Sequence, residues 1–83
     1  LVQNTMLTAD LIIDKNLTIK GTVPLRPFIF VDYNTTTNGI LIDANKKLIL
    51  DNIDIKAINS LNQSVISGTG TLEISGITTI GKQ

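Results

Sequence analysis

The sequence predicts an all-β domain that winds as a parallel β-solenoid of about three coils. Apolar and polar residues alternate over short runs, which is the period of a strand with one buried face. No apolar stripe at helical spacing continues for three turns, so essentially no helix is expected. Similar segments also recur, one of them at an offset of 24 residues, which is about the length of one solenoid coil.

The clearest strand pattern lies at 47–58, read KLILDNIDIKAI. Two alternating runs flank the pair Asp51-Asn52, which has turn chemistry. The inward positions, 48 and 50 before the pair and 53 and 55 after it, slip in phase by one residue across the turn. This slip fits one corner of a coil whose two sides share a core, and a hairpin would also produce it.

The remaining strands follow from short apolar runs bounded by Asp, Asn, Gly and Pro. We expect one β domain over 1–83, with a lead-in or cap at 1–9, coils at 10–80 and a tail at 81–83. Pro24 and Pro27 cannot donate to a ladder, so 22–27 is predicted to be a loop. The predicted strands are 11–13, 17–20, 28–32, 40–43, 47–51, 53–58, 64–67, 71–75 and 77–80.

Composition excludes several classes of function. The chain has 83 residues with no Cys and no His, which excludes thiolate and imidazole metal sites and catalysis by either group. Seven basic residues balance seven acidic ones and are scattered, so no nucleic-acid partner is expected. No apolar run approaches the roughly 20 residues of a transmembrane span. The chain opens on Leu1 rather than Met, which is typical of a processed or excised chain.

Two kinds of internal repeat are present. Three apolar residues followed by Asp-x-Asn occur at 11–16, 29–34 and 40–45, and LILDNIDI at 48–55 matches LEISGITT at 72–79. In the second match Asn52 falls on Gly76, and both residue types tolerate the left-handed conformation of a tight corner. Chance reuse in a short β-rich chain is the alternative explanation. The candidate corner residues, whose amides would bond to the next coil as a ladder, are Asn16, Asn34, Asn45 and Asn52.

Three segments resemble the coils of right-handed parallel β-helix proteins: NLTIKG at 16–21, FIFVD at 28–32 and KLILDNIDIKAIN at 47–59. This group includes the pectate-lyase-like superfamily and adhesin-like surface proteins of bacteria and archaea. The resemblance covers residues 10–80. It implies an extracellular location and either carbohydrate binding or cleavage, or a structural and adhesive role. A β-sandwich or jelly roll, which also uses short strands, is the alternative fold.

The polysaccharide-cleaving members of this group carry a carboxylate cluster with Arg or Lys on one face. Here Asp51 and Asp54 lie near Lys56, with Arg26 in the proline loop. The two aspartates could share Ca²⁺, but a solvated coil exterior is the favoured interpretation, so no metal and no cofactor are predicted. No second carboxylate has a spacing suited to acid–base pairing, and catalysis is therefore not expected.

The candidate carbohydrate contacts are Tyr33, Asp51 and Asp54. Tyr33 is the freest of the three aromatic residues because it stands in an Asp-x-Asn corner. Phe28 and Phe30 could stack on a sugar, but we expect them in the core or in a cap of the solenoid.

The predicted function follows from the ends of such a solenoid. Open strand edges pair with other chains, and solenoids need polar caps. Only Gly81-Lys82-Gln83 follows the last predicted strand. We therefore expect the ends to be covered by copies of the chain or by adjoining coils of a longer one, in an extracellular fibre, appendage, surface layer or adhesin-like β-helix. A carbohydrate-binding or lyase-like module, with glycans as partners, is the alternative.

Overall fold

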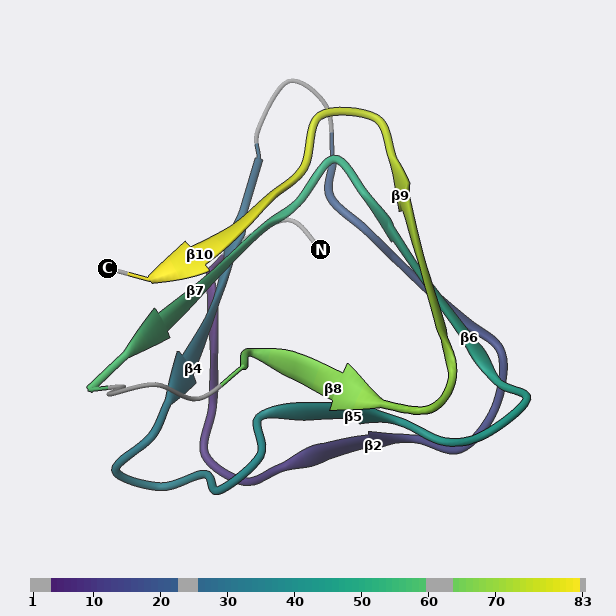
Figure 1. Ribbon diagram of the computed structural model, residues 1–83. Helices are drawn as coiled ribbons and strands as arrows, with labels where there is room; N and C mark the ends of the chain where they lie inside the picture. The colour runs from purple at the N-terminus through teal and green to yellow at the C-terminus, as the bar shows by residue number, and fades with distance from the viewer. Residues whose placement is uncertain (1–3, 23–25, 60–63, 83) are drawn as a thin grey trace.

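The protein consists of short parallel strands arranged around three sides of a triangle (Figure 1). A computed structural model describes residues 4–22, 26–59 and 64–82. The strands in these ranges are β1 (Thr5–Leu7), β2 (Leu11–Ile13), β3 (Leu17–Lys20), β4 (Phe28–Asp32), β5 (Ile40–Ile42), β6 (Lys47–Asp51), β7 (Asp54–Ile58), β8 (Ile66–Gly68), β9 (Thr71–Ser75) and β10 (Thr79–Lys82). None of the described residues is helical, as the sequence predicted.

The strands form three sheets, which we call A, B and C. Sheet A has the order β1-β4-β7-β10, sheet B the order β2-β5-β8 and sheet C the order β3-β6-β9. The chain visits A, B and C in turn three times and then returns to sheet A as β10. Every described strand pairing is parallel. The sandwich or jelly-roll alternative is therefore wrong, because those folds pair their strands antiparallel, and the arrangement is that of a β-solenoid.

The register confirms the repeat that the sequence predicted. Leu48 lies directly on Leu72, and Leu50 on Ile74, in the ladder between β6 and β9. The segments LII at 11–13 and ILI at 40–42 also stack on each other, residue on residue. The third Asp-x-Asn segment, at 29–34, belongs to sheet A instead, so its similarity to the other two does not reflect stacking.

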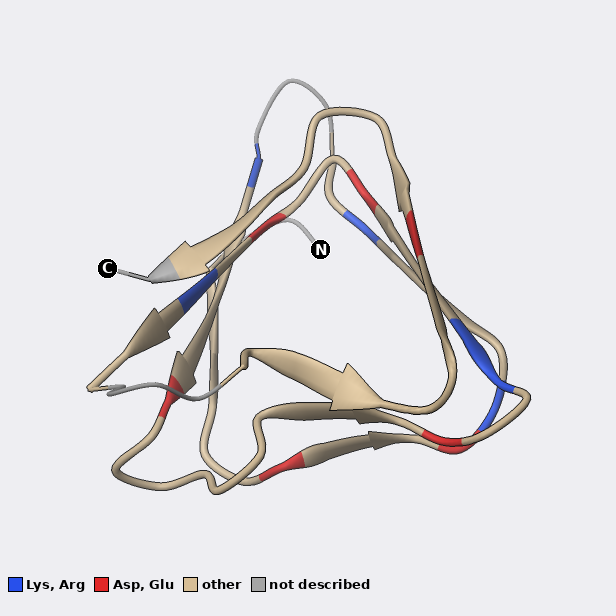
Figure 2. Cartoon of the chain, viewed as in Figure 1, with Lys and Arg blue, Asp and Glu red and all other residues tan. Residues whose placement is uncertain are grey.

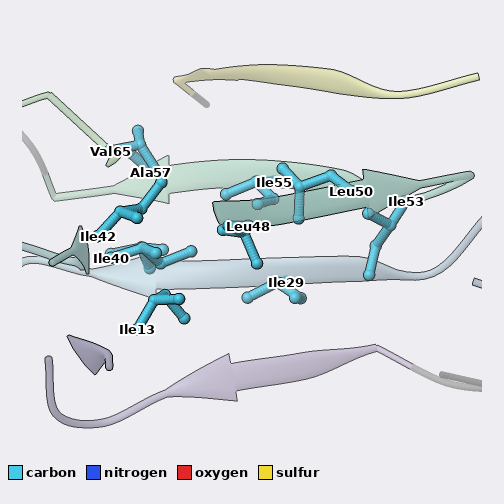
Figure 3. Close-up of a cluster of buried hydrophobic side chains, with 11 residues drawn as sticks. Ile13, Ile29, Ile40, Ile42, Leu48, Leu50, Ile53, Ile55, Ala57 and Val65 are labelled. Carbon is cyan, nitrogen blue, oxygen red and sulfur yellow. The ribbon is translucent and has the colours of Figure 1, made fainter. Parts of the chain in front are cut away.

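The core fills the interior of the triangle and is made almost wholly of aliphatic side chains (Figure 3). The four inward positions around the turn at 51–52 are all 0% exposed, which confirms the predicted phase slip. Both sides of that corner therefore face one core, as in a coil. The buried core residues are Ile13, Ile29, Val31, Ile40, Ile42, Leu48, Leu50, Ile53, Ile55, Ala57 and Val65.

The corner between sheets C and A shows why small and left-handed residues recur there. Asn52 and Gly76 have positive φ angles of 58° and 62°, a region that Asn tolerates and Gly occupies freely. Gly21 stands at the same corner one coil earlier, where its N–H donates to the Asp51 carbonyl. A Cβ atom at Gly21 would collide with the backbone oxygen of Asn52 and with Pro27. Close stacking at this corner therefore requires glycine at position 21.

The strand boundaries differ from the prediction mainly at the two ends. Residues 5–7 of the predicted lead-in form β1 and pair with β4, and β10 extends to Lys82, inside the predicted tail. Both additions belong to sheet A. Parts of the predicted lead-in, of the proline loop around Pro24, of the polar turn after Ile58 and of the tail lie outside the described residues.

Phe28 and Phe30 were predicted for the core or a cap, and that prediction is wrong. They lie on β4, a middle strand, and alternate with the buried residues Ile29 and Val31. The inward side of β4 is already occupied by these aliphatic residues, so both rings face outward from sheet A.

Because the leucines stack in a column, replacing them with alanine should lower the free energy of unfolding by an amount that depends on their position in the column. We expect Leu48→Ala to lower the free energy of unfolding by about 2–5 kcal/mol, because it opens a cavity between two coils. Leu72→Ala in the same column should cost clearly less, since Leu72 is 38% exposed. Urea denaturation of dilute protein measures both variants. Equal losses would show that the two leucines do not differ in packing.

Candidate functional site

The end of the solenoid formed by β8, β9 and β10 leaves apolar side chains uncovered. Leu72 and Ile74 are 38% and 48% exposed although they occupy inward positions, directly over Leu48 and Leu50. Ile80 stacks on the buried Ile55 and is 41% exposed. We call Leu72, Ile74, Ile77 and Ile80 the open-end cluster. Leu72, Ile74 and Ile80 are exposed because no described coil lies over them, and not because they face outward.

The same end also presents unpaired strand edges. Each of β8, β9 and β10 pairs with one strand, and no second partner lies among the described residues. Such edges carry free N–H and C=O groups in the spacing of a ladder, and they template pairing with another strand. Charged side chains, proline and bulges commonly protect edges, but β9 carries only Glu73 as a charged residue. This end of the solenoid therefore presents unpaired strand edges on its three sides and exposed apolar side chains in its centre.

The opposite end, formed by β1, β2 and β3, also leaves inward apolar side chains partly exposed. Leu17 is 36% exposed at an inward position, whereas Leu48, its neighbour in the ladder, is fully buried. Leu7, Leu11 and Ile19 pack against the core but are only partly buried. The column that contains Leu17, Leu48 and Leu72 is thus closed in the middle coil and open at both ends.

A partly buried ion pair ties successive coils together at the corner between sheets C and A. The carboxylate of Asp54 is 3.0 Å from Nη2 of Arg26, and it accepts hydrogen bonds from the hydroxyl (2.6 Å) and the backbone N–H (3.1 Å) of Thr79. Burial raises the pKa of Asp54, but the Thr79 hydroxyl, the charge of Arg26 and the Thr79 N–H outweigh it, so the pKa lies below its ordinary value. Asp54 was predicted to point outward; it does so, yet it is only 2% exposed because Arg26 and Thr79 enclose it.

Two further carboxylates hold the corner between sheets A and B. Asp10 accepts hydrogen bonds from three successive backbone N–H groups at 37–39, at 2.8, 3.0 and 3.1 Å. Asp32 accepts from the side-chain amide of Asn59 at 2.8 Å and from the Asn34 N–H at 2.9 Å. The Thr37 N–H and its neighbours lower the pKa of Asp10, and the Asn59 amide and Asn34 N–H lower the pKa of Asp32. Both groups fasten one coil to the next.

The four asparagines predicted as a corner ladder lie at three different corners. Asn16 accepts a hydrogen bond from the Lys47 N–H at 3.0 Å, so its side chain reaches the next coil. Asn45 and Asn52 adopt positive φ, and Asn52 is buried. Asn34 is exposed in the turn after β4. Asn16 and Asn45 share the corner between sheets B and C, whereas Asn34 and Asn52 lie at the other two corners, so the four do not form one continuous column.

The predicted carbohydrate contacts are likewise distributed over separate parts of the surface. Tyr33 donates its hydroxyl hydrogen bond to the Ser64 carbonyl at 2.9 Å, near sheet B. Burial and the charge of Asp10 raise its pKa. Asp51 ends β6 in sheet C, 3.9 Å from Nζ of Lys20. Asp54 lies in the ion pair with Arg26. The structure thus engages each of the three in a contact within the molecule and does not gather them on one face.

An aromatic surface instead covers the outside of sheet A. Phe28 and Phe30 have ring centroids 5.7 Å apart, and Nζ of Lys56 lies 4.6 Å from the Phe28 centroid. Met6 stands beside Phe30 in the ladder and is 50% exposed. We call Met6, Phe28, Phe30 and Lys56 the sheet A platform. The sequence contains no signal for this outward placement, because residues 28–31 are all apolar.

Charges of both signs are distributed around the perimeter (Figure 2), without a clustered basic face among the described residues. The described residues contain no group of three or more Asp, Glu, His or Cys side chains placed to hold a metal ion. The same part of the chain contains no helix that is long and apolar enough to cross a bilayer.

Comparison with known proteins returns no match to a family model, to a curated protein or to a solved structure.

The pKa of Asp54 predicts an acid-dependent loss of stability. Because its native pKa is below the unfolded value of about 3.9, Asp54 stabilises the fold above that value, and this contribution is lost as the pH falls through the native pKa. At pH 7 we expect Asp54→Asn to cost about 1–3 kcal/mol through weakened charge-assisted hydrogen bonds. Urea denaturation at pH 7 and pH 3 should show the difference between wild type and Asp54→Asn shrinking in acid. A difference that stays constant would contradict the assignment.

Proposed function

We propose that this protein is a structural, non-catalytic β-solenoid that assembles end to end with copies of itself, as part of an extracellular fibre, appendage or surface layer. The observation that carries the proposal is the open-end cluster, whose inward-facing apolar residues lie beside free edges of parallel strands. In a longer adhesin-like chain, adjoining coils would cover the same surfaces. The proposed partners are therefore coils of the same kind.

We propose in addition that the solenoid is a right-handed parallel β-helix of about three coils, similar to the pectate-lyase-like and adhesin-like proteins. The handedness is supported by a general rule. Connections that leave a strand and return to a parallel strand of the same sheet are right-handed in about 98% of cases, because of strand twist. The three successive visits of the chain to sheets A, B and C support the number of coils.

The structural function is supported by how the polar residues are used. The carboxylates of Asp10, Asp32 and Asp54 each accept hydrogen bonds that fasten one part of the solenoid to another. An acid–base pair for glycoside cleavage needs two carboxylates facing one substrate bond. Here the carboxylates face backbone N–H groups and neighbouring side chains instead.

Assembly through the open end predicts that one charge placed there prevents it. We expect wild-type protein to form larger particles as its concentration rises and Ile74→Lys to stay monomeric, because the lysine would be buried at the joint without a partner. Ile49→Lys, on the outward side of the middle strand β6, is the matched control and should assemble normally. Analytical ultracentrifugation and negative-stain microscopy measure the outcome. Wild-type protein that stays monomeric at every concentration would refute self-assembly.

Carbohydrate binding is a second candidate function, favoured by the sheet A platform. Half-buried aromatic rings on the outer face of a sheet, with an adjacent ammonium group, can contact the apolar face and the polar groups of a sugar. A glycan array should then show binding that Phe30→Ala removes and Tyr33→Phe retains, since the Tyr33 hydroxyl is bonded to the Ser64 carbonyl. Absence of binding to every glycan would refute this candidate.

A further inference from the structure

We infer that two copies join end to end with a relative rotation of about a third of a turn, so that β1, β2 and β3 of one copy extend β8, β9 and β10 of the other. The inference rests on the proposed function and specifies its geometry. The partner is a second copy of this chain, recognised by its three free strand edges and by the apolar residues between them.

The rotation follows from the unequal heights of the three sheets. Among the described residues, sheet A has four strands whereas B and C have three each, because β10 already covers the edge of β7. If a second copy docked without rotation, its β1 would extend β10 and its β2 and β3 would stand one strand too high over β8 and β9. Gaps of about one strand spacing, roughly 4.8 Å, would then remain in two sheets. If an unrotated copy were set low enough to close those gaps, its β1 would occupy the same space as β10 and the two strands would clash.

Rotation of the second copy by about a third of a turn removes both the gaps and the clash. The incoming β1 then extends β8, β2 extends β9 and β3 extends β10, so each sheet continues without a missing strand. The outline of the molecule permits the rotation, because its two long extents are nearly equal, 31 and 29 Å, and three sides surround the core (Figure 1). Four stacked strands span about 14 Å, so the shortest extent, 17 Å, lies along the stacking direction.

The side chains at the two ends also match in this arrangement. Leu72 and Ile74 are the inward residues of β9, and Leu11 and Ile13 alternate in the same way on β2. Stacking β2 on β9 would place aliphatic residue on aliphatic residue, as Leu48 lies on Leu72 within the molecule. Ile80 on β10 would receive an inward residue of β3, such as Leu17. Each joint would thus cover Leu72, Ile74 and Ile80, which are exposed in the single molecule.

Contacts of this kind repeat without closing into a ring. One end of a copy binds the other end of the next, and a head-to-tail contact with rotation and translation generates a helical filament. Each copy adds ten strands to three columns, so the rise per copy is expected to be about 16 Å at the usual strand spacing.

Cysteine cross-linking distinguishes the rotated from the unrotated joint, and the chain contains no cysteine of its own. In the rotated joint Glu73 of one copy lies beside Ile12 of the next; in an unrotated joint that brings β3 onto β9, it lies beside Thr18. All three positions are exposed, and neighbouring strands lie within the Cα separation of 4.4–6.8 Å that a disulfide requires. The experiment mixes Glu73→Cys with Ile12→Cys, or Glu73→Cys with Thr18→Cys, in full-length protein under assembling conditions with mild oxidant.

We expect a covalent mixed dimer from the first pair and little from the second, on a non-reducing gel confirmed by mass spectrometry. Cross-linking of the second pair alone would overturn the rotation while keeping end-to-end assembly. Assemblies in which neither pair cross-links would overturn the rotated joint. Failure of all variants and of wild type to assemble would instead refute the proposed function itself. Ile74→Lys added to Glu73→Cys should abolish the first cross-link, whereas Ile49→Lys should leave it intact.

Discussion

Stacking of inward side chains in columns is the constraint on which the rest of this structure depends. Leu48 and Leu50 in the middle coil each lie between two aliphatic residues of the adjacent coils, and both are completely buried. Leu48, between Leu17 and Leu72, is fully buried while both neighbours are more than a third exposed. Parallel ladders on three sides keep these columns in register. The core is therefore a property of adjacent coils and not of any one of them.

The sequence related β6 to β9 through a match at a fixed offset, and it related 11–13 to 40–42 through their shared Asp-x-Asn pattern, although these two segments are 29 residues apart. Leu48 and Leu72 are 24 residues apart and were matched because no insertion separates their coils. Leu17 and Leu48 also stack but are 31 residues apart, since loops of different length intervene. A repeat search at a fixed offset cannot find such a pair. The strand β1 was not predicted because residues 1–9 mix polar and apolar side chains without firm periodicity, and the strand predicted at 77–80 begins two residues before β10.

The polar contacts were the least predictable part of the molecule. Asp10 and the N–H groups of 37–39 come together across 27 to 29 residues, and Arg26 reaches Asp54 across 28. Local sequence contains no signal for these pairs, because the stacking of the coils determines which residues become neighbours. Phe28 and Phe30 were assigned to the core or a cap because they are hydrophobic, and the all-apolar run 28–31 does not indicate which alternate pair faces outward. Hydrophobicity identifies what can be buried, whereas periodicity identifies which side of a strand faces inward.

The dependence of each coil on its immediate neighbours also has a consequence for how the molecule comes apart. In such quasi-one-dimensional proteins stability is approximately a sum of local and nearest-neighbour terms, so opening begins at the ends and proceeds inward. Backbone amides of β6 and β7 would exchange with solvent hydrogen more slowly than those of β9, whose five residues are all exposed. A chain of this design loosens coil by coil, and joining another unit to its frayed end would restrain the fraying of its own last strands.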